Sequence, residues 1–143
     1  MVNDATPIEL TGRPLIAGEA RGPLLRLTHP ISFWGGVDPV RGQIVDPRHP
    51  EFESIITGTV LAIPAAVGSS SSSAIMLELL REETAPAAIL MGKADAILAL
   101  GGVVGQELGY APIPIIEVAP SDLERLPDGA SVTVHKDGRV TLS

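Results

Sequence analysis

Apolar residues recur along the chain in short blocks separated by glycine and proline. Residues 57–64 (TGTVLAIP), 86–91 (PAAILM) and 113–118 (IPIIEV) are apolar runs of strand length bounded by such breakers, which is typical of buried strands. Residues 74–83 (AIMLELLREE) place apolar side chains at i,i+4 spacing with charged ones between them, and 94–109 (ADAILALGGVVGQELG) is a more apolar stretch of helical length. The order strand, helix, strand, helix, strand predicts an α/β layer.

The two ends of the chain add strand signals. Residues 8–27 contain two short extended segments with a bend between them, and residues 130–143 alternate apolar and polar around Asp137-Gly138, which predicts a hairpin with a two-residue turn. Residues 29–50 hold too many prolines and glycines for a helix or a long strand, so we expect a long shaped loop with a functional role. The predicted fold is one α/β domain over 1–143, with a β-rich layer, two main helices and a C-terminal hairpin.

Composition excludes several classes of function. The chain has 143 residues, the size of about one domain, and its 45% of hydrophobic residues is too high for a disordered protein. Its formal charge is −7 and its basic residues are scattered, which argues against a nucleic-acid partner. The longest apolar stretch is too short to span a bilayer, and no secretory signal is visible, so we expect a cytoplasmic protein. There is no cysteine, so this chain alone cannot hold an iron–sulfur cluster by thiolates.

Five consecutive serines, residues 69–73, follow Gly68 and precede the first predicted helix. Composition alone suggests a flexible linker. The context of strand, glycine, serines and helix instead favours a helix start whose backbone N–H groups converge on one point, an arrangement that binds anions. The segment is neither a P-loop nor a nucleophile elbow. A stand-alone module that binds small anions is therefore one functional hypothesis.

Several segments together resemble the swivelling domain, or small subunit, of aconitase X. They are GRPLIAGEARGPLL, ISFWGGVDPVRGQIVDPRHP, GTVLAIPAAVGSSSSSAIMLELL, APAAILMGKADAILALGGVVGQEL and IPIIEV, which follow one another between residues 12 and 118. The resemblance implies a β/β/α swivel domain whose Gly-Ser-Ser loop closes over a large subunit that holds an iron–sulfur cluster. It also implies that Ser69 is the catalytic base, with Gly68 and the amides of Ser70 and Ser71 as the anion cradle.

The resemblance implies a dehydration but leaves the substrate open. Aconitases and isopropylmalate isomerases carry arginine where this chain has Ser71, so a dicarboxylate substrate is doubtful. Members of the aconitase X family act on cis-3-hydroxy-L-proline or on 5-phosphomevalonate. No Lys or Arg lies between Arg48 and Arg81, so the serine loop offers no cation for a phosphate. These features favour cis-3-hydroxy-L-proline, with 5-phosphomevalonate as the alternative.

Residues of the 29–50 loop are secondary candidates. Trp34 with Gly35 and Gly36 either walls the substrate pocket or anchors the loop on the core. Asp38 and His49 are interpreted as a turn residue and a solvated histidine rather than as contacts to a partner. His29 and His135 have no partner at metal-ligand spacing and are assigned no role.

Overall fold

The computed structural model describes residues 8–67 and 71–142. Within them the strands are β1 (Glu9–Thr11), β2 (Arg13–Ile16), β3 (Ala20–Arg26), β4 (Ile31–Ser32), β5 (Val37–Asp38), β6 (Gln43–Ile44), β7 (Val60–Ile63), β8 (Ala66–Val67), β9 (Ala88–Met91), β10 (Ile115–Glu117), β11 (Ser131–Val134) and β12 (Arg139–Leu142). The helices of the same residues are α1 (Phe33–Gly36), α2 (Ser71–Arg81), α3 (Ala96–Glu107) and α4 (Pro120–Leu123).

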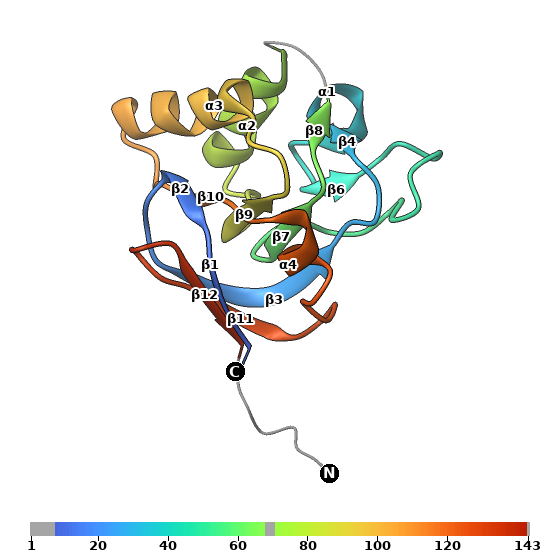
Figure 1. Cartoon of the computed structure of the whole chain (residues 1–143). Helices are drawn as coiled ribbons and strands as arrows, with labels where there is room; N and C mark the ends of the chain where they lie inside the picture. Colours follow the sequence, from blue (N-terminus) through green and yellow to red (C-terminus); the bar gives the residue numbers. More distant parts are fainter. Residues whose placement is uncertain (1–7, 68–70, 143) are drawn as a thin grey trace.

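One mixed sheet organises the domain, with the strand order β1-β12-β11-β3-β7-β9-β10-β2. Its centre is parallel, since β3 pairs with β7, β7 with β9 and β9 with β10 in that sense. The outer strands pair antiparallel. Figure 1 shows the sheet strongly curved, with α2 and α3 at one end of the domain and the β11–β12 hairpin at the other.

Strands β7 and β9, in the middle of the parallel part of the sheet, are buried on both faces, and their side chains alternate between two apolar clusters. In β7, Leu61 and Ile63 join the cluster that includes α2 and α3, whereas Val60 and Ala62 join a second cluster. The second cluster also takes Val132 and other side chains from the β11–β12 hairpin. Continuous apolar runs are therefore required here, as for parallel strands with both faces covered.

Gly12 joins the two edges of this sheet. It is the single residue between β1, at one edge, and β2, at the other. Its N–H donates to the carbonyl of Gly138 at 2.9 Å, and a Cβ added to it would lie 2.4 Å from Cγ2 of Ile116. Only glycine permits this approach, so the small residue lets the sheet curl back on itself around the second apolar cluster.

Helix α3 packs closely on α2 through glycines. A Cβ added at Gly101 would lie 2.5 Å from the carbonyl oxygen of Ser73, in the first turn of α2. The start of α3 is fixed by Asp95, whose side chain accepts hydrogen bonds from the N–H groups of Ile97 and Leu98. The loop before it is held by Glu117, which accepts from the N–H of Ala94 at 3.2 Å.

Most predicted elements are confirmed, and five details are corrected. Residues 8–27 form three strands, β1, β2 and β3, instead of two. Helix α2 begins at Ser71 instead of residue 74, because Ser71, Ser72 and Ser73 belong to its first turn. The 29–50 loop contains β4, α1, β5 and β6. The hairpin turn spans residues 136–138, since the N–H of His135 bonds to the carbonyl of Arg139, and Gly138 takes a φ of +94°. Helix α4 was not predicted. In the described part of the chain, no helix has the length and apolar character needed to cross a membrane.

The contact between α2 and α3 gives a stability prediction at two adjacent glycines. Gly101→Ala forces a backbone carbonyl to move, and we expect a loss of about 1–3 kcal/mol in the free energy of unfolding. Gly102→Ala is the matched control, because its added Cβ meets no backbone atom but only the flexible ends of Ile16 and Ile115, at 2.7 and 3.7 Å from their Cδ1 atoms. That clash is offset by a helix-propensity gain of about 1 kcal/mol. Urea unfolding of both variants checks the contrast, and equal midpoints would contradict it.

Candidate functional site

The candidate site lies where two neighbouring parallel strands end. Beyond the pairing of β3 with β7, the N–H of Leu27 bonds to the carbonyl of Ala62 at 2.8 Å. The chain then bends after both strands and pairs again, with Ile31 opposite Ala66 and Ser32 opposite Val67 in the parallel pair β4 and β8. The FWGG segment follows β4 and the serine segment follows β8. The strands that lead into these two segments, about 35 residues apart in sequence, therefore end side by side, at the strand ends where ligands of α/β sheets bind.

The FWGG segment divides its two aromatic side chains between the core and the surface. Phe33 is fully buried, whereas 63% of Trp34 is exposed. The hydroxyl of Ser32 donates to the carbonyl of Trp34 at 2.9 Å, and Gly35 takes a φ of +78°, a conformation that favours glycine. Phe33 is the anchor of this loop, so the anchoring alternative for Trp34 is wrong, and its indole is available to a ligand or a partner.

The serine segment is described from Ser71 onward. The predicted base Ser69 and its neighbours Gly68 and Ser70 lie outside the described residues, so their roles stay predictions. Ser71 is the first residue of α2, and α1 packs against this helix. Ser72 is only 2% exposed, and its Oγ has no hydrogen-bond partner among the described residues. Ser71, Ser72 and Ser73 thus belong to a helix, which favours the helix-start interpretation over a linker.

A surface hollow of about 390 Å³ lies beside the FWGG segment. Its walls combine Trp34, Gly35 and Gly36 with residues 45–48 of the following loop. The two walls are joined by a hydrogen bond of 2.9 Å from the N–H of Val45 to the carbonyl of Gly36. The three residues predicted as a pocket wall therefore do line a hollow.

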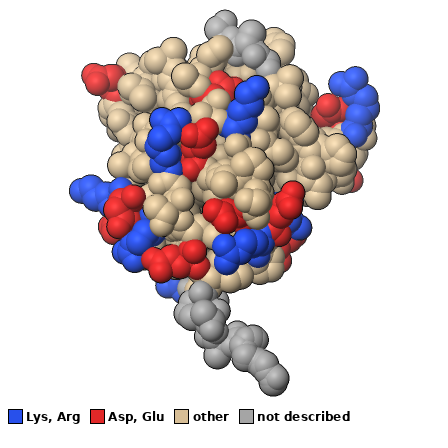
Figure 2. Space-filling view, in the orientation of Figure 1, with Lys and Arg blue, Asp and Glu red and all other residues tan. Residues whose placement is uncertain are grey.

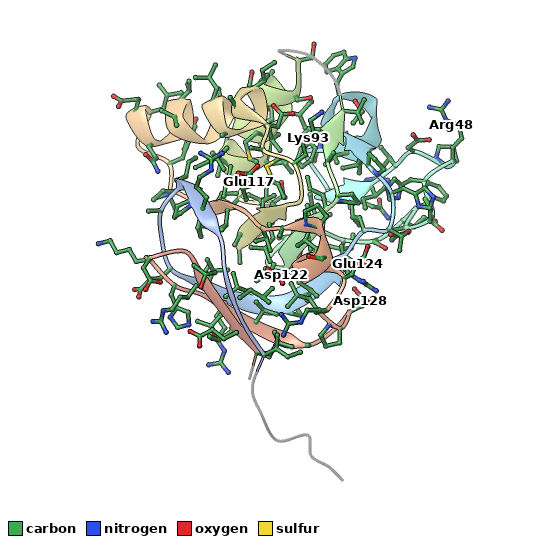
Figure 3. The ribbon with its side chains drawn as sticks, viewed as in Figure 1. Arg48, Lys93, Glu117, Asp122, Glu124 and Asp128 are labelled. Carbon is green, nitrogen blue, oxygen red and sulfur yellow. The ribbon has the colours of Figure 1, made fainter. Side chains whose placement is uncertain are left out.

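Arg48 is a lining residue of this hollow that sequence reasoning missed. It lies 14 positions after Trp34, and only the folding of the loop brings it to the same hollow. Its Nε lies 3.1 Å from Oδ1 of Asp46, and this hydrogen bond holds the pKa of Asp46 below its ordinary value and raises that of Arg48. The Arg48 side chain is 90% exposed and projects from the loop in Figure 3. An exposed cation, paired with Asp46, is therefore present at the site, whereas the serine loop alone offers none.

Two other polar residues of the loop have structural roles. Asp38 accepts a hydrogen bond from the N–H of Val40 at 2.9 Å, which confirms its interpretation as a turn residue. His49 was predicted to be solvated, and this is wrong, because it is only 8% exposed. Its Nδ1 accepts from the N–H of Glu51 at 3.1 Å, and its Nε2 lies 3.2 Å from the carbonyl of His29. His49 thus holds the turn that carries Arg48.

Among residues 8–67 and 71–142, no group of three His, Cys, Asp or Glu side chains could hold a metal ion. What this part of the site offers is a helix start, an exposed aromatic plane, two glycines and one cation. These groups can bind and orient a small anionic molecule. The hollow is open to solvent, so further walls must be supplied if such a molecule is to be enclosed.

Known proteins share both the sequence and the fold. The chain is 42% identical over 132 residues to a cis-3-hydroxy-L-proline dehydratase of Pseudomonas aeruginosa, covering 87% of this chain but only 23% of that relative. It is 38% identical over 131 residues to a phosphomevalonate dehydratase small subunit of Methanothermobacter thermautotrophicus, covering 91% of this chain and 95% of that one.

The crystal structure of Thermococcus kodakaraensis aconitase X in its holo-form superposes with a TM-score of 0.85 at 32% identity, covering 95% of this chain and 98% of that one. Residues 9–142 match the family described as the aconitase X swivel domain. The resemblance drawn from the FWGG and serine segments is thereby confirmed, and the chain belongs to the aconitase X swivel domain family.

Proposed function

We propose that this chain is the small subunit of a heteromeric hydro-lyase of the aconitase X type, and that its serine segment supplies the base. The observation that carries the proposal is the pairing of Ser32 with Val67, since the strands that lead into the FWGG and serine segments end side by side there. It is supported by relatives of nearly the same length that are named dehydratase small subunits. The partner is the aconitase X large subunit.

The reaction we propose is a dehydration across Cα and Cβ of a carboxylic acid, in which Cα bears the carboxylate and Cβ bears the hydroxyl. A base removes the proton from Cα, the electrons of that bond form a double bond to Cβ, and the hydroxyl on Cβ leaves as water after protonation. Ser69 is the proposed base, because an alkoxide at a helix start is stabilised by the N–H groups that converge there. Gly68 and the amides of Ser70 and Ser71 would cradle the substrate carboxylate.

An iron–sulfur cluster on the large subunit is part of this proposal. The chain has no cysteine, which fits a cluster held by the partner. When bound, such a cluster supplies a Lewis acid for the departing hydroxyl. This chain's own part is to place the base and to close the opposite side of the pocket, with Trp34, Gly35 and Gly36 as a wall.

We propose cis-3-hydroxy-L-proline as the substrate. Loss of water gives an enamine with a Cα=Cβ double bond, which tautomerises to Δ1-pyrroline-2-carboxylate when the ring nitrogen loses a proton and Cβ gains one. The exposed face of Trp34 beside two glycines suits a compact ring. Position 71 has serine instead of an arginine for a second carboxylate. A relative 42% identical to this chain is named for this substrate.

Dehydration of 5-phosphomevalonate is the second candidate, and Arg48 is the observation that favours it. This guanidinium lines the hollow that Trp34 walls, and an exposed arginine can pair with a phosphate by two hydrogen bonds. The relatives that match this chain over most of their own length are named for phosphomevalonate.

The mechanism predicts that Ser69→Ala in the complex lowers kcat by roughly 10² to 10⁴-fold, as is typical of a lost general base. Complex formation with the large subunit should be unchanged, and the isolated small subunit should show no turnover. Steady-state kinetics of the reconstituted complex checks this. Sub-millimolar binding of simple carboxylates by the isolated chain in calorimetry would instead favour a stand-alone anion-binding module.

Ser72→Ala is the matched control in the same run of serines. Its hydroxyl is buried and has no partner among the described residues, so its removal should leave the free energy of unfolding unchanged or slightly increased. We expect kcat within a factor of about three of the unmodified complex. If Ser69→Ala and Ser72→Ala lower kcat equally, the assignment of the base is wrong.

The choice of substrate is tested by assaying the complex with both compounds in parallel. We expect turnover of cis-3-hydroxy-L-proline. The KM of the Arg48→Ala variant for this substrate should stay within about threefold of that of the unmodified complex. Turnover of 5-phosphomevalonate alone, with a KM raised about tenfold or more by Arg48→Ala, would reverse the choice and assign Arg48 to the phosphate.

A further inference from the structure

Helix α3 turns most of its large apolar side chains outward, with Leu98 as the buried exception. The exposed ones are 37% to 59% accessible and follow one side of the helix; they are Ile97, Leu100, Val103, Val104 and Leu108, here called the α3 stripe. The face turned toward the domain is instead built mainly of small residues, among them Gly101, Gly102 and Gly105. A helix that served only this domain would bury its large apolar residues.

The α3 stripe is also free of charge. No Asp, Glu, Lys or Arg occurs between residues 96 and 106, although the whole chain has 27 such residues. In Figure 2 the surface over α3 is mostly free of charged side chains except at its outer end, whereas such side chains are spread over the rest of this face. Apolar surface depleted of charge is the composition of the core of a protein–protein interface.

The stripe lies beside the proposed active site. Gly101 touches the first turn of α2 at the carbonyl of Ser73, so α3 crosses α2 near the end where the serine segment enters it. In Figure 1, α3, the start of α2 and α1 all lie at the same end of the domain. A protein that covers the open hollow from this end can therefore reach the stripe as well.

The relatives indicate which protein that is. In the Pseudomonas aeruginosa dehydratase the matched region is 23% of a single longer chain, whereas in the Methanothermobacter thermautotrophicus protein it is 95% of a separate small subunit. A separate chain has no peptide link to hold it to the rest of the enzyme. Non-covalent contacts must replace that link, and apolar burial is the main source of such affinity.

We propose that the α3 stripe is a docking surface for the aconitase X large subunit, which buries it on assembly. This rests on the proposed function, since it requires a large subunit as partner. The outward face of α3 would then bind the small subunit to the large one, whereas the serine segment would take part in the reaction. The partner face should be apolar and should lie next to the mouth of its active site.

The test is binding of the purified chain to the same organism's large subunit, measured by biolayer interferometry. The double variant Leu100→Glu, Val104→Glu should raise Kd about 100-fold or more, because assembly would bury two unpaired charges. Leu108→Glu, at the exposed end of the helix, should raise it by a smaller factor. Thermal melting by circular dichroism should show all variants folded, since the replaced side chains are exposed.

Val40→Glu is the matched control, because Val40 is an exposed apolar residue in the turn between β5 and β6, and β6 lies away from α3 in Figure 1. It should leave Kd unchanged. If the unmodified chain binds the large subunit and the α3 variants bind equally well, the docking proposal is wrong while the proposed function stands. If the unmodified chain does not bind, both are wrong. A third outcome concerns the free chain in sedimentation. If the free chain is a dimer, the α3 variants are monomers and these variants bind the large subunit normally, the α3 stripe is a self-association surface and the proposal is wrong.

Discussion

Burial of both faces of β7 and β9 is the constraint on which the rest of the structure depends. Their side chains alternate between two apolar clusters, one under the helices and one inside the curled sheet. A slip by one residue would exchange the two sets, sending Leu61 and Ile63 to positions shaped for Val60 and Ala62. The register of the parallel strands is therefore fixed, and with it the edge at which the chain leaves them.

That fixed edge explains how two distant segments meet. The chain leaves β3 and β7 at the same end, bends, and pairs once more as β4 and β8 before each segment begins. The core cluster then holds Phe33, which leaves the neighbouring Trp34 in solvent. The site is thus positioned by backbone pairing and by one buried aromatic ring, while the groups that would contact a ligand remain exposed.

An open site and an outward apolar helix face are related features of a domain that works against another protein. The hollow beside Trp34 is open to solvent, and α3 buries mainly small residues, so that most of its large apolar ones point away. The close approach at Gly101 links the two, because it sets the distance between α3 and the first turn of α2. Packing within the domain therefore also decides the relation between the site and the surface beside it.

The sequence by itself determined the main elements and the family. Apolar runs bounded by Gly and Pro identified β7, β9 and β10, the i,i+4 pattern identified α2, and the FWGG and serine segments carried the resemblance that the relatives confirm. These signals are local, since each depends on residues within one turn or one strand. Only the tertiary structure decided what depends on contacts across the chain. It closed the sheet at Gly12, buried His49 under the turn that carries Arg48, and brought Arg48 to the hollow beside Trp34. It also decided which side of α3 faces solvent, because an apolar helix rich in glycine has no polar face from which the buried side can be read.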